Sequence, residues 1–271
     1  MTIHDHDRKM RRLSPRARFL LMAALAVLLV ALPTALYTRL AMVQMRQSRL
    51  ESRGLPAMRA MAQVRLLLRD HQALADAVAA GATHLRRRRV AELDQLTRVL
   101  AAMEPLLAMA PADTPAETSG DTALRGAWTE ARARCDALRS DPAPGVATAV
   151  QDAASQSLLH LQDLLLDHYS LSLDPEYETY YLVRAALAEM PRAADLLVRL
   201  RTQVSTSLNG GAADAADHEQ IASLLRQSLQ QFDQADRATR KVLAADGGLS
   251  AALETPAGEL RARVDALAAA I

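Results

Sequence analysis

The sequence has few aromatic residues, and this scarcity limits the folds it can adopt. Phenylalanine, tryptophan and tyrosine make up 3% of the 271 residues, although hydrophobic residues make up 50%. The hydrophobic cores are therefore built from alanine, leucine, valine and methionine. Almost no stretch alternates β-branched with polar residues, as a strand would. The composition favours helices packed side by side and disfavours an α/β interior.

Cysteine and net charge are also nearly absent. The single Cys135 cannot form an intramolecular disulfide, and no zinc or redox spacing exists for it to join. It could bridge two copies in an oxidising compartment, but we expect a small residue on a helix. The formal net charge is +1, whereas nucleic-acid binding requires a strong basic excess. We therefore expect no nucleic-acid partner.

Catalytic motifs are missing as well. The chain contains no Gly-rich phosphate loop, no GxSxG, no HExxH and no His/Cys cluster at metal spacing. His160 and His168 are eight residues apart and so lie roughly on one helical face, but they have no acidic or histidine partner set nearby. We expect no enzyme, no metal and no cofactor.

One long apolar run is present, from Phe19 to Tyr37, and no charge interrupts it. Nineteen helical residues span roughly 28 Å, close to the ~30 Å hydrocarbon core of a bilayer. The run therefore predicts a transmembrane helix. A cleaved signal peptide is the alternative, but its apolar region is typically ~7–15 residues and ends at a small-x-small site. The exit Pro33–Tyr37 contains no clear site of that kind.

The charges around this run predict its orientation. Six basic residues and two acids precede it: Arg8, Lys9, Arg11, Arg12, Arg16 and Arg18 against Asp5 and Asp7. The positive-inside rule keeps such an N-terminus in the cytoplasm, although Arg39, Arg46, Arg49 and Arg53 reduce the bias. We predict a basic cytoplasmic tail at 1–18, a transmembrane helix at 19–37 and an extracytoplasmic body at 38–271.

Glycine and proline clusters divide this body into helical segments. Helices are expected over residues 40–80, 84–110, 122–139, 146–169, 174–208 and 215–271, with an irregularity at Gly54–Pro56 and a weak point at Gly247–Gly248 and Pro256. Asp174 and Pro175 suit the cap and first position of the fifth helix.

Heptad-like seams run along these helices. In the fifth helix the seam alternates spacings of three and four from Tyr180 to Leu208 without a slip, as in helices packed nearly parallel. The prediction is an all-α fold, with an N-terminal transmembrane helix followed by an elongated antiparallel helical bundle of four-helix type. Six segments allow one bundle with an inserted hairpin, or two stacked bundles.

Polar residues on or near the seams are candidates for ligand contact. His71, His168 and Arg201 stand where the pattern requires apolar side chains, so they either bond across the bundle or contact a ligand. Arg65 and Arg69, four apart, are either a cationic patch for a carboxylate or a solvated face.

The run Arg86–Arg89 is also basic. Consecutive helical residues are rotated about 100° from one another, so four in a row cannot share a face. The run also lies at the start of a helix, where positive charge is unfavourable.

The stretch Leu171–Leu182 (LSLDPEYETYYL), followed by Met190-Pro191, resembles a segment of the periplasmic helical-bundle sensor regions of bacterial transmembrane receptors. In that family the segment typically reads LxLDPxxxSYYL with Leu-Pro downstream, so Thr179 and Met190 are departures. These regions precede methyl-accepting chemotaxis, histidine kinase or diguanylate cyclase outputs. The close match covers about twenty residues, and the rest of the chain agrees only in plan.

The resemblance implies the ligand-sensing region of a chemotaxis-like signal receptor in a bacterial inner membrane. We expect a periplasmic body, a homodimer and a small anion or amino acid as ligand. Because such receptors re-enter the membrane, we expect this chain to be truncated before a second span and an output module. The candidate ligand-binding residues are Arg65, Arg69, His71, Tyr180, Tyr181 and Arg184. Whether the tyrosines contact ligand or pack is left open.

A membrane-tethered helical adaptor or structural coiled coil is the alternative function. A sensor should keep a polar pocket around residues such as His71 or Arg201. An adaptor should be apolar throughout its seams and polar on an exposed partner face.

Overall fold

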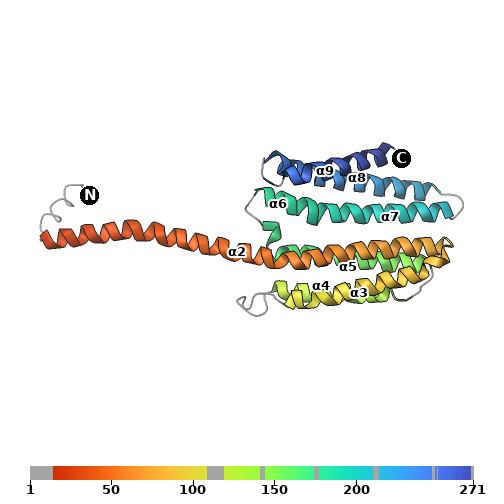
Figure 1. Cartoon of the computed structure of the whole chain (residues 1–271), viewed down its shortest axis with the longest axis horizontal. Coiled ribbons are helices and arrows are strands. Elements are labelled where there is room, and N and C mark those ends of the chain that lie inside the picture. The colour runs from red at the N-terminus through yellow and green to blue at the C-terminus, as the bar shows by residue number, and fades with distance from the viewer. Residues whose placement is uncertain are drawn as a thin grey trace. The chain divides into compact units, whose positions relative to one another are not determined.

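The computed structural model describes residues 15–108, 119–140, 144–173, 177–209, 214–245, 248 and 250–269. These residues form helices and short connections, with no strand among them (Figure 1), so the all-α prediction is confirmed for these ranges. The chain divides into two compact units, Met1–Leu50 and Glu51–Ile271. Helix α2 (Pro15–Ala79) supplies residues to both units.

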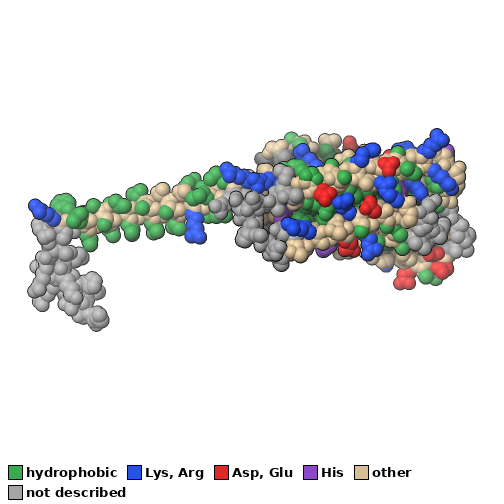
Figure 2. All heavy atoms as spheres, turned by 90° about the horizontal axis from the view of Figure 1, so that it is seen from below, with side chains coloured by type: hydrophobic (Ala, Val, Ile, Leu, Met, Phe, Trp, Pro, Cys, Tyr) green, Lys and Arg blue, Asp and Glu red, His purple; other side chains and the backbone are tan. Residues whose placement is uncertain are grey.

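The described residues of the first unit form the N-terminal part of α2. The large apolar side chains between Phe19 and Met45, among them Leu25 and Leu29, are exposed (Figure 2). Within the described ranges, α2 is the one helix long and apolar enough to cross a membrane. The prediction of a helix able to span a bilayer is confirmed, and its orientation stays a prediction.

The second unit contains the helices after α2. They are η1 (Thr83–Leu85), α3 (Arg86–Ala108), α4 (Ser119–Ala137), α5 (Pro144–His168), η2 (Leu171–Leu173), α6 (Tyr177–Val183), the π-helix η3 (Arg184–Glu189), α7 (Met190–Asn209), α8 (Ala215–Ala244) and α9 (Ser250–Ala269). The expected turn after the first helix is present, with Gly81 at φ +104°. The predicted sixth helix is two helices, and Pro256 lies inside the second.

A hydrophobic core joins residues of α2, α3, α4, α5 and η2. We call this group of elements (residues 51–173) the first layer. Its fully buried side chains include Met61, Leu96, Met103, Leu158, Leu161 and Leu165. The heptad spacing predicts one seam from Ala57 to Val78 in the first helix and one from Leu93 to Leu107 in the second. Most of these residues are buried: Ala57, Met61, Val64, Leu68, His71, Leu93, Leu96, Leu100 and Met103. That part of the heptad prediction is confirmed.

Helices α6 to α9, with η3, form a second layer (residues 177–269), which Figure 1 shows on the other side of α2 and α5 from α3 and α4. Its buried apolar residues include Ala193, Leu200, Phe232 and Val242. Many contacts between the two layers are polar. They include Gln72 Nε2 donating to Thr202 Oγ1 at 3.2 Å, and Arg192 on Asp163 at 2.8 Å.

The irregularity expected at Gly54–Pro56 is not found, because α2 is helical throughout these residues. Gly54 is instead required by packing. A Cβ at this position would lie 2.6 Å from Cβ of Tyr169, at the end of α5.

The predicted fifth helix is also not uniform. Asp174 and Pro175 lie outside the described residues, and the rest consists of α6, η3 and α7. Pro191 has no N–H to give the carbonyl four residues earlier, at Leu187. Gln162 Nε2 donates to that carbonyl, and the Met190 N–H bonds to Ala185 in the i→i−5 pattern of a π-helix.

The π-helix explains why the predicted seam fails in α7. A π-helix shifts the register of all later residues, so the continuous seam is wrong beyond η3. Thr202 is buried, whereas the Arg201 side chain is 46% exposed and pairs with Asp76.

Candidate functional site

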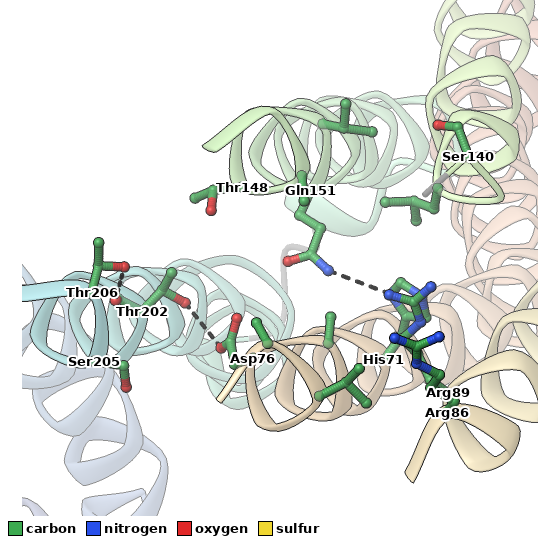
Figure 3. Close-up of a pocket in the computed structure, with 16 residues that line it drawn as sticks. His71, Asp76, Arg86, Arg89, Ser140, Thr148, Gln151, Thr202, Ser205 and Thr206 are labelled. Atoms are coloured by element: carbon green, nitrogen blue, oxygen red, sulfur yellow. Dashed lines mark hydrogen bonds between the residues drawn. The ribbon is translucent and has the colours of Figure 1, made fainter. Parts of the chain in front are cut away.

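A polar cavity of about 380 Å³ lies where α2, α4 and α7 end and α3 and α5 begin. We call it the polar end cavity. Its polar lining residues are His71, Asp76, Arg86, Arg89, Ser140, Thr148, Gln151, Thr202, Ser205 and Thr206 (Figure 3). The lining comes from both layers, because residues of α7 face residues of α2, α3 and α5 across the cavity.

His71 and Gln151 form one wall. The Gln151 amide Nε2 lies 3.5 Å from His71 Nδ1, so the amide donates and this ring nitrogen accepts. His71 is 3% exposed, and burial together with the charge of Arg89 lowers its pKa to about 4. The imidazole is therefore neutral at pH 7, and it contributes hydrogen-bonding capacity without charge.

Asp76 lies on the opposite side of the cavity (Figure 3). Its carboxylate accepts from Thr202 Oγ1 and from Arg201, both at 3.3 Å. Burial raises the pKa of this carboxyl, and Arg201 opposes that effect. Asp76 thus connects α2 to α7 at the edge of the cavity.

Arg86 and Arg89 supply the positive charge. They are three residues apart at the start of α3, so they share a face of that helix, and Figure 3 shows both beside His71. Arg86 makes no hydrogen bond or ion pair with any residue in the described ranges. A guanidinium in this state has its full fork of donors free for a carboxylate.

The arrangement separates charges of opposite sign. Arg86 and Arg89 lie at one end, the Asp76 carboxylate lies at the other, and the hydroxyls of Thr148 and Ser205 also line the space. A small carboxylate that carries an amino or hydroxyl group would match these partners. These charges and hydrogen-bonding groups are suited to holding a small polar solute.

The six predicted site residues fall in three places. His71 lines the polar end cavity. Arg65 and Arg69 line a second cavity of about 340 Å³ that also reaches Gln162 and Pro191, and we call it the Arg65 cavity. Tyr180, Tyr181 and Arg184 line neither cavity. The structure brings Arg65 and Arg69 together and leaves the other four apart from them.

The tyrosines and Arg184 contact their own layer. Lys241 Nζ donates to Tyr181 Oη at 2.8 Å and lies 4.1 Å from the ring centroid, a cation–π contact. The Tyr180 and Tyr181 rings pack edge-on. Arg184 Nε pairs with the buried Glu189 at 3.3 Å. The Lys241 contact joins α6 to α8, whereas the tyrosine pair lies within α6 and the Arg184–Glu189 pair lies within η3.

Sequence reasoning missed most of the polar end cavity. The run Arg86–Arg89 was expected to share no single face, although the i,i+3 spacing of Arg86 and Arg89 could have indicated that these two do. Asp76, Gln151 and Thr202 carry no local signal, because they meet only through the packing of three helices.

No protein-family model matches the chain, and no curated protein or solved structure matches it either. Among the described residues, no group of three or more His, Cys, Asp or Glu side chains could hold a metal ion. The chemistry of the two cavities is therefore the ground on which a function can be assigned.

Proposed function

We propose that this chain is the membrane anchor and ligand-sensing region of a bacterial signal receptor of the chemotaxis type. In this proposal α2 crosses the inner membrane with its N-terminus in the cytoplasm, and the body is periplasmic. The observation that carries it is the polar end cavity, in which Arg86 has no partner among the described residues and Asp76 lies opposite. Together these groups fit a small anion or an amino acid.

The arrangement of the two layers supports the finer architecture. The first layer has its own apolar core from four helices, and the second layer is built from α6 to α9. We propose two four-helix bundles side by side, of which the second shares helices with the first. Two copies anchored in one bilayer would gain effective concentration, which favours a homodimer.

The proposed mechanism is a ligand-biased choice between two arrangements of the layers. A ligand held by Arg86 and Arg89 of α3 and by Thr202 of α7 contacts both layers at once. It favours the arrangement in which these groups are closest. A coupling of about 1–3 kcal/mol is enough for signalling.

The adaptor alternative is less well supported. An adaptor core should be apolar along its seams, whereas His71 and Gln151 are buried and face a cavity with charged walls. Buried polar groups such as these cost stability unless they are partnered. A ligand that supplies hydrogen-bonding and charged partners would offset this cost, which favours a ligand-binding role over an adaptor.

The test is a ligand screen on the full chain in non-ionic detergent micelles. Hydrophilic carboxylates and amino acids are added, and thermal unfolding is followed by the emission of Trp128, the one tryptophan. A ligand at a hundred times its Kd adds about 2.7 kcal/mol, which raises Tm by about 5–10 °C for a body of this size.

Arg86→Gln should abolish the shift because it removes the free guanidinium. Arg87→Gln is the matched control, since Arg87 is exposed like Arg86 but does not line the cavity. If no compound in the screen raises Tm, or if Arg86→Gln responds like wild type, the sensor proposal loses its support and the adaptor gains.

A further inference from the structure

The Arg65 cavity differs in chemistry from the polar end cavity. Its walls come from α2, α5, η3, α7, α8 and α9, and most of the lining residues are apolar. The main apolar lining residues are Met58, Leu187, Met190, Pro191, Phe232 and Leu260. Two arginines, Arg65 and Arg69, are the only charged residues in this lining.

Arg65 is a buried cation with neutral hydrogen-bond partners. It is 4% exposed, and it donates to Gln162 Oε1 at 3.0 Å and to the Pro191 carbonyl at 2.7 Å. Burial is the main reason that its pKa falls to about 10, and the charge of Arg69 lowers it further. Arg65 remains charged at pH 7, and a buried charge is costly without an opposite charge in contact.

The nearest carboxylates are engaged elsewhere. Asp163 accepts from Arg192 with both oxygens at 2.8 Å. Asp195 accepts from Ser155 and pairs with Arg199 at 3.0 Å. Both act on Arg65 only through space.

Arg69 is one turn further along α2. It is half-buried, and burial lowers its pKa. It makes no hydrogen bond or ion pair with any other residue that the structure describes. Two cations of like charge therefore line one largely apolar cavity, and neither is in contact with an anion from the described part of the chain.

We propose that the Arg65 cavity binds an amphipathic monocarboxylate, with its carboxylate on Arg69 and Arg65 and its apolar body against Met190, Phe232 and Leu260. A guanidinium matches the planar carboxylate with paired N–H donors. Burial of the chain or ring of the ligand supplies the hydrophobic part of the affinity. This second ligand class goes beyond the proposed function, and its binding does not require a sensory role.

Hexanoate is the probe, with two control compounds that each carry half of its chemistry. Acetate has the charge without the apolar body, and hexan-1-ol has the apolar body without the charge. The full chain in non-ionic micelles is heated at pH 7.5 and constant ionic strength, and Trp128 emission reports unfolding. Hexanoate at a hundred times its Kd should raise Tm by about 5–10 °C. Acetate and hexan-1-ol at the same concentration should give less than half of that shift.

Arg69→Gln should weaken hexanoate binding at least tenfold. Arg69 suits this test because its removal breaks no hydrogen bond within the described ranges. Arg59→Gln is the matched control, since Arg59 is exposed on the same helix and does not line the cavity. Arg86→Gln, which disables the polar end cavity, should leave the hexanoate shift unchanged.

If Arg69→Gln fails to fold, Ala62→Leu carries the test. Ala62 is an exposed residue that lines the cavity, so a larger side chain there fills the binding space without disturbing the core. It should also weaken hexanoate binding at least tenfold. The proposal is overturned if hexanoate gives no shift, if acetate or hexan-1-ol matches it, or if the cavity variants respond like wild type. If hydrophilic carboxylates or amino acids still raise Tm in that case, the proposed function is unaffected.

Discussion

Replacing Gly54 with alanine sets two effects of opposite sign against each other. Glycine inside a helix is about 1 kcal/mol less favourable than alanine, so helix propensity alone predicts that Gly54→Ala stabilises the protein. Packing predicts the reverse, because the new Cβ would lie 2.6 Å from Cβ and 2.7 Å from Cγ of Tyr169. These atoms are at the base of that side chain, so a rotamer change moves them little.

Tyr169 has little room to yield. It is 1% exposed, and its hydroxyl donates to the Leu106 carbonyl at 3.1 Å. Overpacking of this kind costs typically about 1–3 kcal/mol. A 2.6 Å contact is shorter than real Cβ contacts, so we expect a cost in the upper part of this range, about 2–3 kcal/mol. With the propensity gain of about 1 kcal/mol subtracted, Gly54→Ala should lose about 1–2 kcal/mol, which lowers Tm by about 2–8 °C for a body of this size.

The assay is thermal unfolding of the full chain in non-ionic micelles, followed by Trp128, which belongs to the same core as Tyr169. Gly126→Ala is the matched control. Gly126 lies inside α4, and a Cβ there meets nothing within 4 Å, so this variant should gain up to about 1 kcal/mol.

Tyr169→Gly provides a second check. In that background both Cβ and Cγ of residue 169 are absent, and Gly54→Ala should become stabilising. If Gly54→Ala is as stable as wild type, or if its sign is the same with and without Tyr169, the proposed close packing of α2 against this tyrosine is wrong.

Two further predictions concern pH and topology. Because the folded-state pKa of His71 is about 4 against 6.5 for the free side chain, the unfolded chain binds a proton more readily between these values, and stability falls as pH is lowered. From pH 7.5 to pH 5 wild type should lose about 2 kcal/mol more than His71→Gln in urea unfolding, and equal losses would contradict a buried neutral imidazole. Fusions at Ile271 should be active with a periplasmic phosphatase and dark with a cytoplasmic fluorophore, and the reverse pattern would refute the proposed topology.

The apolar periodicity was sufficient to predict the buried faces of α2 and α3. Met61 and Val64 of α2 and Leu96 and Met103 of α3 are fully buried, and each belongs to a seam with spacings of three and four. Such a seam must face another apolar surface, so burial follows from the pattern itself. The partner of each seam does not follow, because leucine and methionine seams pack against one another with little selectivity.

The π-helix and the two cavities required information from distant parts of the chain. Pro191 indicates a missing N–H, but its consequence depends on Gln162, which donates to the carbonyl that Pro191 leaves without a partner. Likewise, Arg86 and Asp76 line one cavity only because α2, α3 and α7 align at a particular register. The register of one helix against another is set by side-chain packing between them, so it cannot be predicted from the residue pattern of a single helix.

Polar residues in α7 also follow heptad spacing, and this pattern explains where the site lies. Arg192, Asp195, Arg199 and Thr202 are spaced three, four and three residues apart, and each contacts α2 or α5 of the first layer. The opposite, more apolar face of α7 packs on α8.

Helix α7 therefore makes two interfaces of unequal stability, a polar one with the first layer and an apolar one with α8. Partly exposed ion pairs contribute little each, about 0–1 kcal/mol, whereas every apolar side chain buried in a core contributes about 1.5–3 kcal/mol. We expect the layers to be held to each other more weakly than either is held together within itself, as is usual for polar interfaces inside a chain. The polar end cavity lies at this weaker boundary, where a ligand that contacts both layers changes their relative stability most.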